Sequence, residues 1–225
     1  MRASNNLRSR ARKIFDWVED EIWRGRVRVA MLGSRGEDEY LSRLAIMHRK
    51  LGISEEYAAR GLCLFREARE IVCVPAGPNG ELRPLAPVAW SRASEMRKAA
   101  EADGVMLTVR WGFRSVADQA RMIRKQLSYG KSLDEALNRI AAPGYSEHHT
   151  GRAIDFERIP ANIPFDRTPA FAWLYRNAAK FEFRMSYPPD NPYGIIYEPW
   201  HWYCYSGEMP EMDFDVASDP APAAV

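Results

Sequence analysis

Two short segments of the sequence bring together residue types that can catalyse hydrolysis. The first runs from Ser146 to Asp155 and reads S-E-H-H-T-G-R-A-I-D, and the second, E-P-W-H, runs from Glu198 to His201. Between them they supply imidazoles, one carboxylate that could complete a metal site and a second carboxylate that could act as a base. A hydrolytic zinc centre needs three protein ligands, an open position for water and a base beside that water. Three of the four histidines lie in these segments, which favours a chemical role for them.

A third block, R-W-G-F-R-S from Arg110 to Ser115, precedes both segments. Together the three blocks resemble the D-alanyl-D-alanine carboxypeptidases and dipeptidases of the vancomycin-resistance type. Those enzymes belong to a wider group of zinc peptidases with lysostaphin-like and hedgehog-like members. Short motifs recur by accident, but three blocks in the family's order and at plausible distances are specific evidence. The resemblance covers the chain from about Leu107 to Tyr205.

The resemblance implies a role for each of the candidate chemical residues. His148, Asp155 and His201 match the family's zinc ligands, and Glu198 matches its general base. Two neutral imidazoles and one carboxylate would leave one zinc ion positively charged with a free site, which lowers the pKa of bound water to about 7. Glu198 would take a proton during attack and pass it to the leaving amine. His149 is the rival of His148, but the alignment of S-x-H-x-x-G-x-A-x-D places the ligand at His148.

Further residues are candidates for holding the substrate. Arg114 matches the arginine of the family's G-Y-R-S block, where a guanidinium can stabilise an oxyanion or hold a carboxylate. Ser146 could bind substrate or shape the turn, Trp200 is expected to wall the site, and His149 to line the pocket. Gln119 follows the arginine block, and we interpret it as part of a solvated helix face.

The chain departs from the family pattern at two places. The family commonly continues W-H-x-R-Y, whereas His201 is followed here by W-Y-C, so the arginine is missing. A glycine that usually precedes the late strand is replaced by Glu182. The first departure bears on recognition of the substrate's end, and neither touches the expected zinc ligands.

Composition limits the classes of function. The chain has 225 residues, of which 46% are hydrophobic and 12% aromatic, so a globular core is expected. The net charge is +2 and no basic block follows the first dozen residues, which argues against nucleic-acid binding. No segment has the length of a transmembrane helix or the pattern of a signal peptide. We therefore expect a cytoplasmic protein or one released by lysis, since a periplasmic location fits less well.

The three cysteines form no disulfide framework, and pairing of Cys63 with Cys73 is left open.

Hydrophobic periodicity, capping signals and proline positions predict an α+β fold. We expect a small antiparallel sheet that carries the zinc site, with helices packed on one side and an N-terminal helical extension. Helices are predicted over 7–23, around 41–48, after Ser54, and over 88–102, 115–127, 132–140 and 168–181. Strands are predicted over 105–110, 153–156, 183–185 and 195–197.

The same signals divide the chain into four parts. Residues 1–74 form an N-terminal helical region, 75–86 a loop or linker, 87–207 the zinc peptidase domain and 208–225 a disordered tail.

The function predicted from the resemblance is zinc-dependent hydrolysis of peptidoglycan-type peptides. The expected partners are stem peptides or other D-alanine-terminated peptides, and the simplest activity is that of a D-alanyl-D-alanine carboxypeptidase. One alternative is a lysin-like endopeptidase on the same stem peptides. Another is a catalytically silent, zinc-containing module that binds cell-wall peptides, although a pure scaffold would not need the base Glu198.

Overall fold

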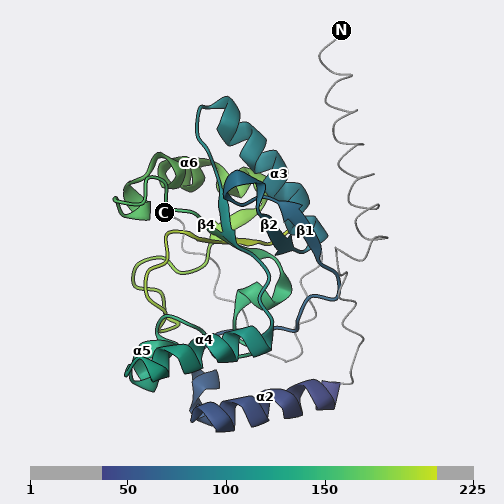
Figure 1. Cartoon of the computed structure of the whole chain (residues 1–225), viewed down its shortest axis with the longest axis vertical. Helices are drawn as coiled ribbons and strands as arrows, with labels where there is room; N and C mark the ends of the chain where they lie inside the picture. Colours follow the sequence, from purple (N-terminus) through teal and green to yellow (C-terminus); the bar gives the residue numbers. More distant parts are fainter. Residues whose placement is uncertain (1–36, 207–225) are drawn as a thin grey trace.

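The computed structural model describes residues 37–206 (Figure 1). The helix predicted over 7–23 and the tail predicted over 208–225 lie outside the described residues. The elements in chain order are α2 (Glu37–Leu51), η1 (Glu55–Arg60), β1 (Val72–Pro75), η2 (Pro78–Gly80), β2 (Leu82–Leu85), α3 (Pro87–Ala102), β3 (Val109–Trp111), α4 (Val116–Ser128), α5 (Leu133–Leu137), η3 (Glu147–Thr150), β4 (Ala153–Phe156), η4 (Phe165–Arg167), α6 (Pro169–Asn177), η5 (Ala178–Phe181), β5 (Phe183–Met185) and β6 (His201–Cys204), where η denotes a 3-10 helix.

A four-stranded antiparallel sheet forms the centre of the fold, with the strand order β3-β4-β6-β5. Every residue of the two central strands is buried. In the register of these strands, Asp155 on β4 lies opposite His201 on β6. Trp111 on β3 also pairs with Asp155, next to a register shift. The sheet therefore brings together segments that are far apart in the sequence.

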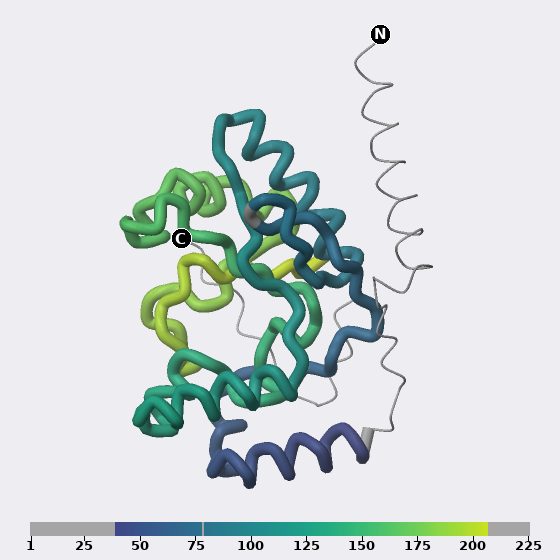
Figure 2. The backbone as a smooth tube through the Cα atoms, in the orientation of Figure 1, coloured from purple at the N-terminus to yellow at the C-terminus, as the bar shows by residue number. Residues whose placement is uncertain are grey.

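The helices form two groups, of which the one with α3 and α6 shares a core with the sheet. Figure 1 shows α3 and α6 on one side of β4, and α4, α5 and α2 on the other. The main core joins α3 and α6 to the strands through side chains such as Met96, Leu174 and Phe156. A second cluster joins α2, α4 and α5, and in Figure 2 the purple α2 runs beside the teal α4. The predicted α+β class is confirmed, and α2 belongs to the predicted N-terminal helical region.

Several local predictions are confirmed by the capping contacts. The Ser115 hydroxyl accepts a hydrogen bond from the Asp118 backbone N–H at 3.1 Å and so caps α4. Ser132 and Glu135 form the predicted capping box at the start of α5. Such contacts satisfy backbone donors that the first helical turn leaves without partners. Local sequence thus places the starts of both helices.

Residues 75–86 differ from the expected irregular loop. They complete a hairpin in which β1 and β2 pair antiparallel, with Val72 opposite Leu85. Its second strand lies against the sheet, since the Phe113 N–H donates to the Pro84 carbonyl at 2.7 Å. A Cβ at Gly112 would lie 2.2 Å from that same carbonyl oxygen, so this approach requires glycine. The proposed division of the chain at residue 87 is not tested by these contacts.

The predicted strands differ from the observed ones in two places. Residues 195–197 form no strand, and the backbone N–H of Ile196 donates instead to the Asn138 carbonyl at 2.9 Å. Strand β6 was not predicted, because H-W-Y-C is buried on both faces and shows no alternation.

Glu182 stands where the family usually has glycine, and its backbone adopts a conformation that favours glycine. Glu182 ends η5 with φ 62° and ψ 35°, the left-handed region that glycine enters without strain.

Within residues 37–206, no helix combines the length and the apolar character needed to cross a bilayer.

Candidate active site

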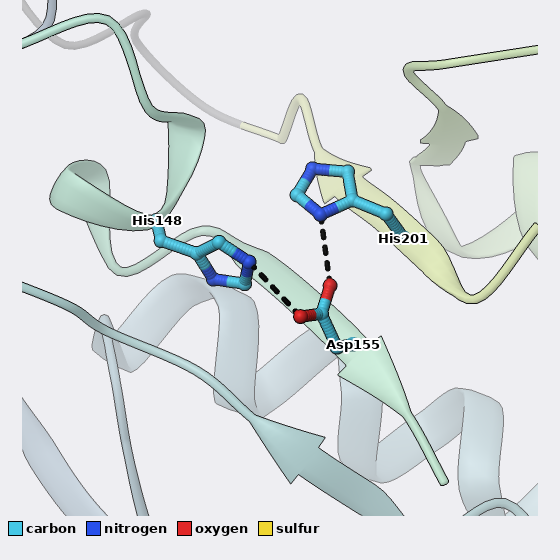
Figure 3. Close-up of side chains that lie close together, drawn as sticks. All are labelled: His148, Asp155 and His201. Carbon is cyan, nitrogen blue, oxygen red and sulfur yellow. Dashed lines mark hydrogen bonds and ion pairs between the residues drawn. The ribbon is translucent and has the colours of Figure 1, made fainter. Parts of the chain in front are cut away.

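His148, Asp155 and His201 come together in the folded chain. Each offers one ligand atom, and these atoms all lie within 4.8 Å of one another. All three residues are buried, with exposures of 4%, 7% and 2%. Figure 3 shows the carboxylate of Asp155 between the two imidazole rings. Its oxygens lie 3.3 Å from Nε2 of His148 and 2.8 Å from Nδ1 of His201. The residues that match the family's ligands therefore converge on one point.

His148 is placed by a short 3-10 helix that ends at Gly151. The φ of Gly151 is 66°, and a Cβ there would lie 2.8 Å from the backbone nitrogen of Ala86. Nδ1 of His148 lies 2.7 Å from the Gly112 carbonyl, so this nitrogen carries the proton and donates it. Burial lowers the pKa of His148, although the neighbouring Asp155 raises it in part. Nε2 faces Asp155 at 3.3 Å and is the ring nitrogen left to bind a metal.

His201 lies between two carboxylates. Nδ1 is 2.8 Å from Oδ1 of Asp155, and Nε2 is 2.8 Å from Oε2 of Glu147. Burial alone would lower the pKa of His201, but the two carboxylates outweigh it and raise the pKa to about 10. Burial likewise opposes ionisation of Asp155, yet His148 and His201 lower the pKa of its carboxyl well below the ordinary value.

These charges fit a divalent cation. Two imidazole nitrogens and one carboxylate form the donor set of many catalytic zinc sites. Metal binding releases protons from its ligands, so a cation would replace the proton that His201 holds at Nδ1 towards Asp155. Glu147 would keep its hydrogen bond to the other ring nitrogen, as carboxylates beside ligating histidines usually do.

Glu198 and Arg114 line the same cavity as these three residues. Burial raises the pKa of Glu198 to about 7, although His201 and Arg114 lower it in part. Within the described part of the chain, no hydrogen bond or ion pair holds its carboxylate. NH2 of Arg114 lies 4.0 Å from Oδ2 of Asp155, and its side chain is 16% exposed. A carboxylate that titrates near neutrality and a guanidinium thus face the same space.

Gln119 is not on a solvated helix face, and that interpretation was wrong. It is 1% exposed, and its amide donates to the Ala141 carbonyl at 2.7 Å. Its Oε1 accepts a hydrogen bond from NH1 of Arg114 at 3.1 Å. Gln119 therefore orients Arg114, and the helical pattern gave no signal for this because the contact depends on α4 packing beside the site.

The candidate substrate residues fall into two groups. Ser146 and Trp200 line the cavity, whose volume is about 590 Å³. His149 is fully buried and lies outside the lining, because its two ring nitrogens contact the backbone of Arg114 and Gly144 at 2.6 and 3.1 Å. Contact of any of these three with a substrate stays a prediction.

Two residues of the site were missed from the sequence. Glu147 holds His201, and the ring of Tyr187 packs on His201 with centroids 5.0 Å apart. A carboxylate directly before the expected ligand His148 could have drawn attention to Glu147. The sequence around Tyr187, which is a Pro/Asp/Asn turn region, carries no comparable signal.

Comparisons with known proteins place this geometry in context. The family model described as VanY, D-alanyl-D-alanine carboxypeptidase, matches residues 83–208. A D-alanyl-D-alanine carboxypeptidase of Enterococcus faecalis is 34% identical over 119 residues, which cover 48% of this chain and 43% of that protein. The match thus spans less than half of the curated relative's length.

The chain is also similar to solved structures. The structure of the LdcB LD-carboxypeptidase has 29% identity and a TM-score of 0.50, and the likeness covers 54% of this chain and 59% of that chain. A variant of the vancomycin resistance D,D-pentapeptidase VanY in complex with Zn(II) has 26% identity and a TM-score of 0.47, with 58% and 77% covered.

Proposed function

Because the chain belongs to the VanY D-alanyl-D-alanine carboxypeptidase family, we propose that it is a zinc-dependent peptidase that removes the terminal D-alanine from peptidoglycan-type peptides. The predicted membership of this family is confirmed by the match over residues 83–208. The activity is proposed on the arrangement of the site's own side chains.

One observation carries the proposal. A buried His-Asp-His group with ligand atoms within 4.8 Å shares one cavity with a glutamate whose pKa is raised to about 7. Three ligands and a nearby base are the protein's part of a hydrolytic zinc site. When bound, zinc would polarise the substrate carbonyl and make water a better nucleophile.

The chain's own residues would then handle protons and charge. Glu198, with a pKa near neutrality, can take a proton from the attacking water and return it to the leaving amine. Arg114 can stabilise the negative oxygen that develops on the carbonyl, or hold the terminal carboxylate of the substrate. Gln119 fixes NH1 of Arg114 through a hydrogen bond at 3.1 Å, which leaves the other guanidinium nitrogens for substrate.

A second candidate is an endopeptidase acting on the same stem peptides. The observation that favours it is the missing family arginine, whose position is taken by Tyr203. A tyrosine has no positive charge to bind the terminal carboxylate of a substrate. Tyr203 is also 1% exposed and does not line the cavity. Arg114 is then the candidate anchor nearest the metal group for a terminal carboxylate.

The silent binding module is the weaker alternative. A module that only binds peptides has no use for a half-buried glutamate that titrates near neutral pH inside the cavity.

The test is mass spectrometry of purified muropeptides and of paired synthetic stem peptides after incubation with zinc-loaded protein. One member of each pair ends in free D-alanyl-D-alanine and the other in its amide. A carboxypeptidase should release D-alanine from the free acid and reject the amide. Equal cleavage of both would favour the endopeptidase, and unchanged peptides alongside full zinc occupancy would contradict both enzymes.

A further inference from the structure

The cavity carries more positive charge than the proposed chemistry uses. Beyond the metal group, Glu198 and Arg114, the charged side chains that line it are three arginines and one aspartate. The arginines are Arg110, Arg139 and Arg158, and the aspartate is Asp166. We call these three arginines the arginine rim.

The rim arginines come from two parts of the wall. Arg110 lies within β3, and Arg158 follows the end of the paired strand β4, so both belong to one region of the sheet. Arg139 follows α5, where the neighbouring Asn138 carbonyl accepts a hydrogen bond from Ile196 at 2.9 Å. The positive charges therefore come from two separate parts of the lining.

The rim arginines are available to a ligand. All three are exposed, whereas Arg114 is 16% exposed, so the rim lies on the solvent side of the metal group. Within residues 37–206, no ion pair or side-chain hydrogen bond engages Arg139 or Arg158. The one ion pair of Arg110, with Glu157, is long at 3.9 Å, and the arginine side chain there is 54% exposed. Exposed pairs of this kind hold their partners weakly.

We propose that the arginine rim recognises carboxylates on the substrate upstream of the cleaved bond, so that the site selects acidic peptides. This inference rests on the proposed function for the identity of the substrate as a peptide. Guanidinium groups bind carboxylates through paired hydrogen bonds and present a fixed positive charge at any working pH. Charges around a cleft also raise the rate at which an oppositely charged ligand arrives. Outside the metal group and Glu198, Asp166 is the single opposing carboxylate among the lining residues.

The test measures binding and cleavage separately. Two stem peptides that end in D-alanyl-D-alanine are compared, identical except that two internal residues carry free carboxylates in one and carboxamides in the other. Their affinities are measured by calorimetry for the zinc-loaded Glu198→Gln protein, with the rim intact and with Arg110→Gln, Arg139→Gln and Arg158→Gln introduced singly and together. Lys98→Gln, an exposed charge on α3 outside the cavity lining, is the matched control.

The acidic peptide should bind about fivefold more tightly than the neutral one, the size expected for an exposed ion pair. The preference should shrink in each rim variant, vanish in the triple variant and weaken with salt, because exposed charges are screened. Lys98→Gln should keep the full preference. Equal affinities with the rim intact, no measurable binding of either peptide, or a preference that survives in the triple variant would overturn the inference.

Cleavage by protein that keeps Glu198 separates the two proposals. If neither peptide is cleaved but the preference depends on the arginine rim, the proposed function fails and carboxylate recognition by the arginine rim stands. If both peptides are cleaved with equal kcat/KM and bound equally, the rim fails and the proposed function stands.

Discussion

Replacement of Glu147 should weaken zinc binding although this residue is not among the expected ligands. Its Oε2 lies 2.8 Å from Nε2 of His201, and it is 8% exposed. Because Nδ1 of the same ring faces Asp155, Nε2 is the nitrogen that a carboxylate must hold when the ring binds metal. Loss of such a partner typically lowers metal affinity about 10- to 100-fold, or by about 1.4 to 2.8 kcal/mol.

Two substitutions at Glu147 should weaken zinc binding to different extents. Glu147→Gln keeps the volume and can still accept through its amide oxygen, but it loses the charge, so we expect about a tenfold loss of zinc affinity. Glu147→Ala leaves a buried N–H without a partner, and its loss should approach the hundredfold end of that range. The order, with alanine worse than glutamine, follows directly from the hydrogen bond.

The assay is competition for zinc against a chromophoric chelator of known affinity, with folding of each variant checked by circular dichroism. Glu95→Gln, which removes an exposed carboxylate on α3, is the matched control and should bind zinc as the wild type does. Wild-type zinc affinity in a folded Glu147→Ala protein would show that Glu147 does not support His201 as a zinc ligand.

Three further outcomes are expected. Glu198→Gln should keep zinc and lose about a hundred- to ten-thousand-fold in kcat, and near-normal turnover at confirmed zinc occupancy would contradict its role as base. Arg114→Lys should lower kcat more than it raises KM if the planar fork stabilises the oxyanion, whereas damage mainly in KM would indicate a carboxylate anchor. Burial lowers the pKa of His149 from 6.5 to about 3, so between these pH values the unfolded chain binds a proton that the folded chain does not. The free energy of unfolding should therefore decrease as the pH is lowered from 6.5 towards 3. This group alone should account for a decrease of about 2–3 kcal/mol near pH 4.5. Chemical denaturation of the metal-free protein should show that His149→Gln removes this part of the loss, and an unchanged pH dependence would contradict it.

The three residues proposed to hold the metal were identified in the sequence because their motifs resemble those of a zinc peptidase family. The fold places one ligand atom of each of the three residues within 4.8 Å of the others, a geometry that could hold one ion. The helix starts at Ser115 and Ser132 could be predicted because a cap is made by residues three positions apart.

The contacts that were missed join parts of the chain that are distant in sequence. Gln119 reaches Arg114 and the Ala141 carbonyl only after α4 packs beside the site. Glu147 reaches His201 across the sheet, and β6 hides its strand character because both of its faces are buried. A single sequence without its tertiary packing does not reveal such pairs.

Release of D-alanine from a peptide ending in D-alanyl-D-alanine is the decisive measurement for the proposed zinc peptidase. The rate is measured for the zinc-loaded wild type, for the same protein after removal of zinc by a chelator, and for the zinc-loaded Glu198→Gln variant. We expect rapid release in the first case, its loss and recovery on removal and return of zinc, and a rate at least about a hundredfold lower in the variant. Equal release by all three samples, or none by the fully zinc-loaded wild type, would contradict it.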